Sequence, residues 1–561
     1  MIRAAALLSL AATLTLAQVA PVTKTEASGD LHRQVDKVFA KWDSTVSPGC
    51  ALSVIQDGQI IYKRGYGMAD LDHDIPITPK TVFHVASISK QFTASAILLL
   101  AQEGKISLDD DVRKYIPELP DFGVPITIRH LIHHTSGLRD QWSLLGLAGW
   151  RYSLDLITDD DVLDVISRQK ELNFKPGAEY VYCNTGFTLL AQIAKRVSGQ
   201  SLREFTGKRI FQPLGMNSTH FRDDHAEIVK NIAYGYVDGE GGTYRLSVTN
   251  FDTVGATSLL TTVEDMAHWD GNFYHPKVGG PQFVKQQLEN GSLNSGKSID
   301  YASGLSLGKY RGLPTVGHGG ADAGYRADFL RFPEQHFAVA CFCNKGEINP
   351  GELTQRVADI YLASGFKEPP PARSTETLKS VPVAAERLAQ YPGLYFNKDD
   401  ERLVRVTVKD GKVSLAFSGG GGREMTALSE STFRLANGPR ELTFADGGGG
   451  PAQKLSIQFP GAKKPDVYER VAEFQPTPNE LAAYAGSYVS QEIDPIYRIV
   501  VENGTLVLKR LKSKPETLEP TIAHTFWGLN GDLHFQQGPR GEITGFTLNA
   551  GRVKNFHFAK Q

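Results

Sequence analysis

Ser87 and Lys90 are the residues whose types and spacing point most directly to chemistry. They form a Ser-x-x-Lys pattern that runs into a long apolar helical pattern over Gln91–Glu103. On a helix, Lys90 would lie one turn after Ser87 and on the same face. The positive end of the helix dipole and burial would both disfavour a charged ammonium group there, so that Lys90 could accept the serine proton. The spacing therefore predicts a serine nucleophile with a lysine base.

Three other Ser-x-x-Lys patterns occur in the chain, and they begin at Ser167, Ser306 and Ser364. Their context separates them from the first pattern. Among the four serines, only Ser87 opens a long apolar helical pattern, which is the arrangement that would bury the lysine. We therefore assign the nucleophile to Ser87.

Two further motifs follow along the chain. A Tyr-Cys-Asn triplet at 182–184 lies before a helical pattern over Thr188–Val197 and offers a phenol and an amide on a short loop. A His-Gly-Gly triplet at 318–320 precedes strand-like residues, and its glycines would let a substrate backbone approach closely. Each triplet alone is usually structural. The three motifs in this order indicate one active site.

With these motifs, the region from about Ser47 to Phe366 resembles the serine β-lactamase and penicillin-binding-protein superfamily. The resemblance is to its class C and D-alanyl-D-alanine carboxypeptidase branch, and it includes the stretches 128–138 and 213–216. It implies an α+β fold, with an antiparallel sheet flanked by helices and a helical subdomain. Tyr-x-Asn replaces the class A Ser-Asp-Asn, and His-Gly-Gly replaces the Lys-Thr-Gly of many members; the His form is similar to that of carboxypeptidases, D-aminopeptidases and esterases of this superfamily.

The resemblance also implies roles for individual residues. A serine would attack a carbonyl, the lysine and tyrosine would share its proton, and the acyl-enzyme would then be hydrolysed. The asparagine would orient the substrate amide, and the histidine would contact a substrate carboxylate or tune the proton network. The catalytic set is Ser87, Lys90 and Tyr182; the substrate-binding set is Asn184, His318, Gly319 and Gly320; the oxyanion hole is the backbone N–H groups of Ser87 and Ala321.

We therefore expect an exported serine hydrolase that acts on amide or ester bonds of small substrates. D-amino-acid peptides or amides are favoured, and a class C-like esterase or β-lactamase is the alternative. A non-catalytic penicillin- or envelope-binding protein is an alternative of another class, although the intact motifs argue against it. We expect a small-molecule or short-peptide substrate and no cofactor.

Composition and an internal repeat indicate how the chain is divided into segments and domains. Arg3 and the apolar run Ala4–Ala17 are typical of a signal peptide, here residues 1–20, and predict a periplasmic or secreted protein without a membrane anchor. A Pro-rich linker is predicted at 367–382, after a hydrolase domain at 28–366.

Beyond the linker the chain repeats itself with an offset of 93 residues, since Tyr391 matches Tyr484 and Asp410 matches Asn503. Short strands and Gly-rich turns predict two small antiparallel β-barrels, at 383–474 and 478–561. They are similar to the lipocalin-like barrels of D-aminopeptidase. We expect a loop of the second barrel, at Arg510–Pro520, to reach the active-site cleft.

Charge and the metal-ligating residue types exclude other classes of function. The chain has 60 Lys and Arg against 62 Asp and Glu, which gives no electrostatic basis for binding nucleic acid. Its four cysteines are too few for a disulfide scaffold, although Cys50 could pair with Cys341 or Cys343. His130, His133 and His134 lack a third ligand in a matching pattern, so no metal site is expected.

Overall fold

A computed structural model describes residues 24–370, 380–399, 402–417, 421–435, 440–445, 450–459, 462 and 464–561. The predicted signal peptide lies outside the described residues, as does most of the predicted linker. Among the residues that are described, no helix combines the length and the hydrophobicity needed to cross a bilayer.

The hydrolase region is built on a six-stranded antiparallel sheet with strand order β10-β11-β12-β13-β1-β2. Asp57 and Gly58, with φ of 52° and 72°, form the predicted hairpin turn between the first two strands. The strands are β1 (Cys50–Gln56), β2 (Gln59–Tyr66), β10 (Ser306–Tyr310), β11 (Leu313–Asp322), β12 (Tyr325–Phe332) and β13 (Phe337–Cys343).

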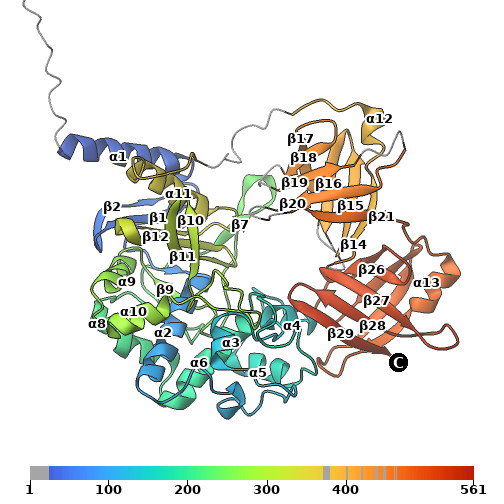
Figure 1. Cartoon of the computed structure of the whole chain (residues 1–561), viewed down its shortest axis with the longest axis horizontal. Coiled ribbons are helices and arrows are strands. Elements are labelled where there is room, and N and C mark those ends of the chain that lie inside the picture. The colour runs from blue at the N-terminus through green and yellow to red at the C-terminus, as the bar shows by residue number, and fades with distance from the viewer. Residues whose placement is uncertain are drawn as a thin grey trace, which may run out of the picture.

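Helices cover both faces of this sheet. Helices α1 (Lys24–Phe39) and α11 (Pro350–Tyr361) pack side by side on one face, where they enclose a separate apolar core (Figure 1). On the other face, the short 3₁₀ turn η2 (Ala86–Ile88) contacts β11 and β12, and helix α9 (Asp265–Tyr274) contacts β1 and β2. The long buried helix α2 (Ser89–Gln102) follows η2.

The remaining elements of the hydrolase region surround α2. The helices are α3 (Ile128–Ile132), α4 (Gln141–Leu147), α5 (Asp159–Ser167), α6 (Asn184–Ser198), α7 (Leu202–Thr206), α8 (Gln212–Leu214) and α10 (Gly280–Gln287). The short strands are β3 (Met68–Asp70), β4 (Ile75–Pro76), β5 (Phe83–His84), β6 (His220–Phe221), β7 (Tyr236–Asp238), β8 (Tyr244–Leu246) and β9 (Leu259–Thr261).

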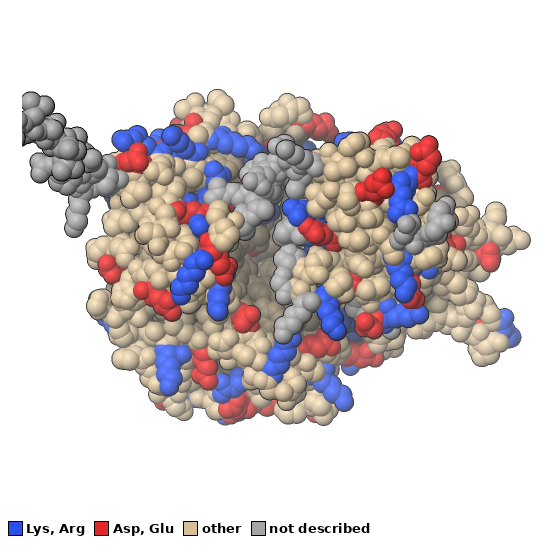
Figure 2. Space-filling view, turned by 45° about the horizontal axis from the view of Figure 1, so that its top comes forward, with Lys and Arg blue, Asp and Glu red and all other residues tan. Residues whose placement is uncertain are grey.

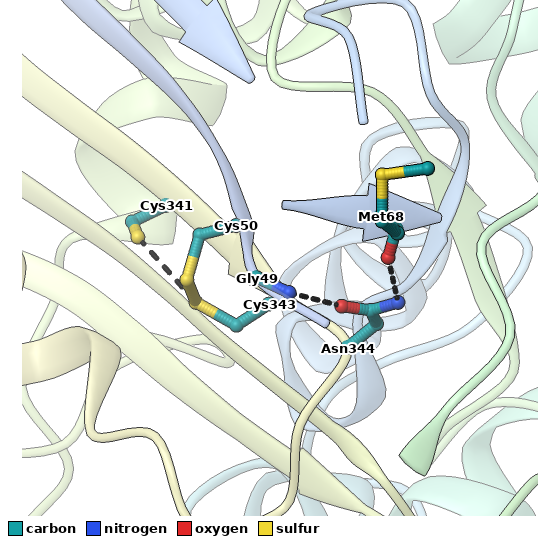
Figure 3. Close-up of a disulfide and its surroundings, with 6 residues drawn as sticks. All are labelled: Gly49, Cys50, Met68, Cys341, Cys343 and Asn344. Atoms are coloured by element: carbon teal, nitrogen blue, oxygen red, sulfur yellow. Dashed lines mark hydrogen bonds between the residues drawn. A yellow bond between two sulfur atoms is a disulfide. The ribbon is translucent and has the colours of Figure 1, made fainter. Parts of the chain in front are cut away.

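A disulfide ties the first strand of the sheet to a late one. Figure 3 shows Cys50 of β1 bonded to Cys343 of β13, which stand opposite each other in the strand register. Of the two partners that the sequence left open, the structure thus selects Cys343. Cys341 is a buried free thiol whose Sγ lies 3.7 Å from that of Cys343. Asn344 accepts from the backbone N–H of Gly49 and so joins the same two chain segments.

Two closed barrels of eight antiparallel strands follow, as the repeat predicted. The first has helix α12 (Ala385–Leu388) and strands β14 (Gly393–Asn397), β15 (Arg402–Lys409), β16 (Lys412–Phe417), β17 (Arg423–Ala427), β18 (Thr432–Leu435), β19 (Glu441–Phe444), β20 (Lys454–Gln458) and β21 (Asp466–Val471). The second has helix α13 (Pro478–Tyr484) and strands β22 (Gly486–Val489), β23 (Tyr497–Glu502), β24 (Thr505–Lys509), β25 (Glu516–Pro520), β26 (Thr525–Gly528), β27 (Gly531–Gln537), β28 (Ile543–Ala550) and β29 (Val553–Lys560).

The repeated residues occupy matching positions in the two barrels. The hydroxyl of Tyr395 donates to the carbonyl of Tyr391 at 2.8 Å, and that of Tyr488 donates to the carbonyl of Tyr484 at 2.6 Å. Each bond closes the turn that leads from a short helix into the first strand of its barrel. The repeat in sequence is therefore a repeat in structure.

The second barrel is continuous with the hydrolase region, whereas the first has a core of its own. One cluster of buried apolar residues runs from the hydrolase helices into the second barrel, and the first barrel has a separate cluster. Figure 1 shows the red strand β29 beside α4. At this contact Arg139 forms a fully buried ion pair with Glu492, with Nη1 2.6 Å from Oε2. The second barrel is thus part of the folded hydrolase.

Glu492→Ala should lower the free energy of unfolding by about 3–5 kcal/mol, because it leaves the Arg139 guanidinium buried without its counter-charge. Asp494→Ala is the matched control, since Asp494 pairs with Arg168 but its side chain is 86% exposed. This control should cost at most about 1 kcal/mol. Urea unfolding followed by tryptophan fluorescence measures both. Equal, small losses for the two variants would contradict a buried tie between barrel and hydrolase.

Candidate active site

Ser87 stands on the η2 turn at the edge of a cleft, directly before α2. Its neighbour Ala86 has φ of 50°, a left-handed conformation that is strained for a residue with a side chain. Two hydrogen bonds to the backbone of Ala86 stabilise this conformation. The Ala86 N–H donates to His84 Nδ1, and Ser89 Oγ donates to the Ala86 carbonyl. The local structure therefore fixes the direction in which Ser87 points.

Lys90 lies one turn further along, fully buried beneath Ser87. Its Nζ is 3.1 Å from Ser87 Oγ, 2.9 Å from Asn184 Oδ1 and 2.7 Å from the carbonyl oxygen of Ala256. Burial lowers the pKa of Lys90 to about 7, and the positive charge of Arg552 acts in the same direction. A neutral amine has two N–H groups and one lone pair. If the amide and the carbonyl receive the N–H groups, the lone pair faces the Ser87 hydroxyl.

Tyr182 covers the other side of this lysine, with its ring centroid 4.9 Å from Lys90 Nζ. Burial raises the pKa of Tyr182 above its usual value, while the interaction with Ser87 acts to lower it. The phenol therefore keeps its proton near neutral pH. A protonated Tyr182 can donate a proton but cannot accept one from Ser87, so of the two groups expected to share the serine proton, Lys90 is the one placed to accept it.

Asn184 is the first residue of α6, and a buried carboxylate fixes its orientation. Asp140 Oδ2 accepts from both the backbone N–H and the side-chain Nδ2 of Asn184, at 2.7 and 2.8 Å. The amide oxygen is thereby turned toward Lys90. The sequence motifs did not identify Asp140; its only signal was a position before an apolar helical segment, where it caps α4.

Strand β11 brings the His-Gly-Gly motif against the Ser87 turn. A Cβ at Gly320 would lie 2.2 Å from the carbonyl oxygen of Val85, so only glycine permits this approach. His318 Nε2 lies 3.0 Å from the hydroxyl of Tyr301. Burial, together with Lys90, lowers the pKa of His318 to about 4. This histidine is therefore neutral: its Nδ1–H donates to the carbonyl of Gly319 and its Nε2 accepts from the Tyr301 hydroxyl, so it offers a substrate no positive charge.

The predicted site residues meet at a cavity of about 750 Å³. All of them line it except Lys90, which is buried beneath Ser87. Figure 2 shows the molecule hollowed between the hydrolase and the barrels, with acidic and basic side chains mixed on this face. The cavity is lined by Ser87, Trp142, Tyr152, Tyr182, Asn184, Ala256, Thr257, His318, Gly319, Gly320, Ala321, Asp322, Arg326, Ala327, Asp328, Ile348, Asn349, Pro350, Gly351 and Arg552.

The second barrel reaches this cavity through Arg552, in the turn between β28 and β29. Its Nη1 lies 3.4 Å from Asp140 Oδ2, and its guanidinium lies 5.0 Å from the centroid of the Tyr182 ring. The expectation that Arg510–Pro520 reaches the cleft is wrong. Arg510 instead donates to the Gly146 carbonyl and lines a separate cavity. Nothing local distinguishes Arg552 in the sequence, because only barrel closure and docking bring it to the site.

The three histidines singled out in the sequence have separate partners. His130 Nδ1 accepts from the backbone N–H of Thr127 and caps α3. His133 Nδ1 lies 3.3 Å from the carbonyl of Tyr301. The ring of His134 packs against that of Tyr182, with centroids 4.2 Å apart. These contacts give each histidine a structural position around the active site.

Residues 35–363 match the Beta-lactamase family, so the chain belongs to this family. Together with the fold and with homologues that are D-aminopeptidases, this match identifies the protein as a serine hydrolase of that family. The two C-terminal barrels lie beyond the matched residues.

The chain is also similar in sequence to a penicillin-binding protein and to D-aminopeptidases. The chain is 29% identical to "Penicillin-binding protein 4*" of Bacillus subtilis over 70% of this chain and 89% of the relative. It is 26% identical to a D-aminopeptidase of Gluconobacter oxydans over 80% of each chain. A D-aminopeptidase of Brucella anthropi is 30% identical over 53% of this chain and 56% of its own length.

Solved structures agree on the fold. The octameric penicillin-binding protein homologue from Pyrococcus abyssi superposes with a TM-score of 0.54 at 25% identity, over 79% of this chain and 99% of its own. The D-amino acid amidase from Ochrobactrum anthropi SV3 superposes with a TM-score of 0.50 over 60% of this chain and 99% of its own. At 22% identity this second likeness concerns the fold alone.

Proposed function

We propose that the protein is an exported hydrolase of D-amino-acid peptides and amides, acting through an acyl-enzyme on Ser87. The observation that carries the chemistry is the buried lysine beside the serine, held by two acceptors that leave its lone pair for the serine proton. The choice of D-amino-acid amides is supported by the D-aminopeptidase of Gluconobacter oxydans, whose similarity covers 80% of each chain and so extends beyond the hydrolase region.

Acylation begins when Ser87 Oγ attacks the substrate carbonyl carbon and its proton moves to Lys90 Nζ. The backbone N–H groups of Ser87 and Ala321 receive the developing oxyanion. Tyr182 then donates its proton to the leaving nitrogen and is reprotonated by the Lys90 ammonium. The amine departs, an ester on Ser87 remains, and Lys90 is again neutral.

Deacylation uses the same groups in the opposite direction. Water attacks the ester carbonyl and loses a proton to the neutral Lys90. The acid is released as Ser87 Oγ recovers its proton. Throughout, Asn184 orients the substrate amide, and the neutral His318 holds the Tyr301 hydroxyl beside the site. Of the two roles expected for His318, we propose the tuning of the proton network, because a neutral imidazole cannot neutralise a substrate carboxylate.

Export is part of the proposal. The predicted signal peptide at 1–20 motivates it, and the Cys50–Cys343 disulfide supports it, since disulfides persist mainly in oxidising compartments. Secretion of the full-length chain with loss of its first residues, read by N-terminal sequencing of the mature protein, tests this part. Recovery only in the cytoplasm with residues 1–20 retained would contradict it.

A substrate panel tests the activity. Purified protein is assayed against D- and L-amino-acid p-nitroanilides, p-nitrophenyl esters and nitrocefin. We expect the D-amino-acid p-nitroanilides to be cleaved with a higher kcat/KM than their L forms, and nitrocefin to be a poor substrate. Preference for the L forms or for nitrocefin would contradict the proposed substrate. Turnover of none would favour a binding protein.

The pH dependence follows from Lys90. Because the neutral amine is the base, kcat/KM for an ester without an amine of its own, such as p-nitrophenyl acetate, should rise with pH and level off above about 7, the pKa of Lys90. Arg552→Gln removes a positive charge that lowers this pKa, so the acidic limb should move to higher pH. Arg326→Gln is the control, since Arg326 lines the same cavity but its guanidinium is hydrogen-bonded to the carbonyls of Ala323 and Tyr325. A limb that Arg552→Gln leaves in place, or moves to lower pH, would contradict the assignment of Lys90.

A further inference from the structure

A carboxylate on the wall of the cavity, Asp322, exchanges no proton and binds no substrate atom in the mechanism above, although its charge acts to raise the pKa of Lys90. It ends strand β11, one residue after Ala321, and lines the cavity together with Ser87. It is buried, with a side-chain exposure of only 3%. A carboxylate kept out of water this fully is costly unless something offsets its charge. The groups around Asp322 therefore indicate which kind of ligand this part of the cavity binds.

The groups around Asp322 are neutral donors. Thr257 Oγ1 donates to Oδ2 at 2.6 Å, and the Tyr152 hydroxyl donates to Oδ1. His84 Nε2 stands 3.8 Å from Oδ2, but burial lowers the pKa of His84, so this ring carries little charge near neutral pH. Within the described part of the chain, no lysine or arginine forms an ion pair with Asp322. The carboxylate thus has hydrogen bonds but no cation.

Arg326 does not serve as that cation, although it also lines the cavity. Its Nη1 donates to the carbonyl oxygens of Ala323 and Tyr325 at 3.0 and 2.7 Å, and so is held against the β11–β12 turn. Arg552, the other arginine on the wall, pairs with Asp140 and lies over Tyr182. The cavity therefore has a positive group on one wall and an uncompensated negative group on another.

Aromatic rings stand beside the carboxylate. The rings of Trp142 and Tyr152 meet edge to face with centroids 5.3 Å apart, and both line the cavity. Phe251 stacks on Trp142 at 4.9 Å and holds it in place. A carboxylate next to aromatic side chains is an environment that favours an alkylammonium group, through an ion pair and a cation–π contact together.

We propose that Asp322, with Trp142 and Tyr152, binds the free α-ammonium group of the acyl residue. This inference rests on the proposed function and deepens it: substrates are those whose acyl residue carries an unblocked amine. A substrate ammonium in this position supplies the cation that the described residues leave out. N-acylated or N-terminally extended substrates lack the charge and would leave Asp322 buried and unpaired.

The test compares D-alanine p-nitroanilide with its N-acetyl derivative, using the full-length protein. For the unaltered protein the ratio of their kcat/KM values should be about 10–100 in favour of the free amine, as expected for a hydrogen bond between charged groups. Asp322→Asn keeps the acceptor for Thr257 but removes the charge, and should bring this ratio near one. Asp328→Asn is the matched control, because Asp328 is another, half-buried carboxyl of the same cavity that accepts from a hydroxyl, that of Thr354.

The Asp328→Asn variant should keep the ratio of the unaltered protein. A ratio near one in the unaltered protein, or an unchanged ratio in Asp322→Asn, would overturn the proposal. Hydrolysis of p-nitrophenyl acetate, which carries no amine, is followed in parallel. No hydrolysis of this ester or of either p-nitroanilide by the unaltered protein would refute the proposed function, which is a different failure.

A second measurement covers the case in which Asp322→Asn does not fold. D-alaninol and N-acetyl-D-alaninol are compared as inhibitors of p-nitrophenyl acetate hydrolysis by the unaltered protein. The amine should compete with the ester at a concentration about 10-fold or more below that of its acetylated form. Equal inhibition, or stronger inhibition by the acetylated form, would overturn the proposal.

Discussion

Ser87→Ala should abolish turnover, with kcat falling by about 10⁴–10⁶-fold on every substrate that the unaltered protein cleaves. The reason is that no other hydroxyl can replace it: Ser87 Oγ is the group that Lys90 Nζ contacts, and the strained Ala86 turn fixes its position. The same variant should lose labelling by a fluorophosphonate probe. Release of p-nitroaniline and fluorescence of the labelled protein measure the two effects.

The chain supplies a matched control in a second Ser-x-x-Lys pattern. Ser167 ends helix α5 and donates to the carbonyl of Asp164, outside the cavity. Ser167→Ala should keep both the activity and the labelling. Continued labelling of Ser87→Ala, or loss of labelling in Ser167→Ala, would show that the nucleophile lies elsewhere.

Lys90→Met should lower kcat by about 10³–10⁴-fold while leaving the fold intact. Methionine is unbranched and apolar, so it suits a buried helix position and removes only the base. Without a lone pair beside it, Ser87 keeps its proton during attack, and the loss should persist at high pH rather than be rescued there. Rates from pH 6 to pH 10, with circular dichroism as a check on folding, measure this effect.

Lys170→Met is the control for the lysine, because Lys170 is exposed at the end of the same second pattern. It should leave the rate and its pH profile unchanged. If Lys90→Met retained most of its activity, the base would have to be another group, and the neighbouring Tyr182 would be the candidate. The raised pKa of Tyr182 argues against that outcome.

The parts of the site that the sequence predicted are those whose chemistry is encoded locally. Ser87 and Lys90 are separated by one helical turn, and the buried pattern after them is a property of that helix alone. Likewise, Asn184 begins the helix that its motif preceded. Strand and turn patterns were similarly sufficient for the β1–β2 hairpin and for the repeat of two barrels.

The residues that were missed depend on contacts between distant segments. Arg552 follows Asp140 by 412 residues, yet the two side chains meet at the active site. The loop at Arg510–Pro520 was the wrong choice because the way a closed barrel docks is decided by a buried interface. Arg139 and Glu492 form a buried ion pair in that interface, and no local pattern relates them.

The same contacts link the second barrel to the active site. Because Arg552 touches Asp140, and Asp140 orients Asn184, the barrel contributes to the geometry and the charge of the active site. Removing the whole barrel would also expose the buried Arg139 and part of a shared apolar core. Single substitutions such as Arg552→Gln therefore separate its effect on catalysis from its effect on stability.

The acyl-enzyme on Ser87 is tested most directly by trapping it. The protein is mixed with a D-amino-acid p-nitrophenyl ester, quenched in acid during turnover, digested and analysed by mass spectrometry. The mechanism predicts that the acyl group is found on the peptide that contains Ser87, as an ester on that side chain. Turnover without an adduct, or an adduct on a different residue, would contradict it.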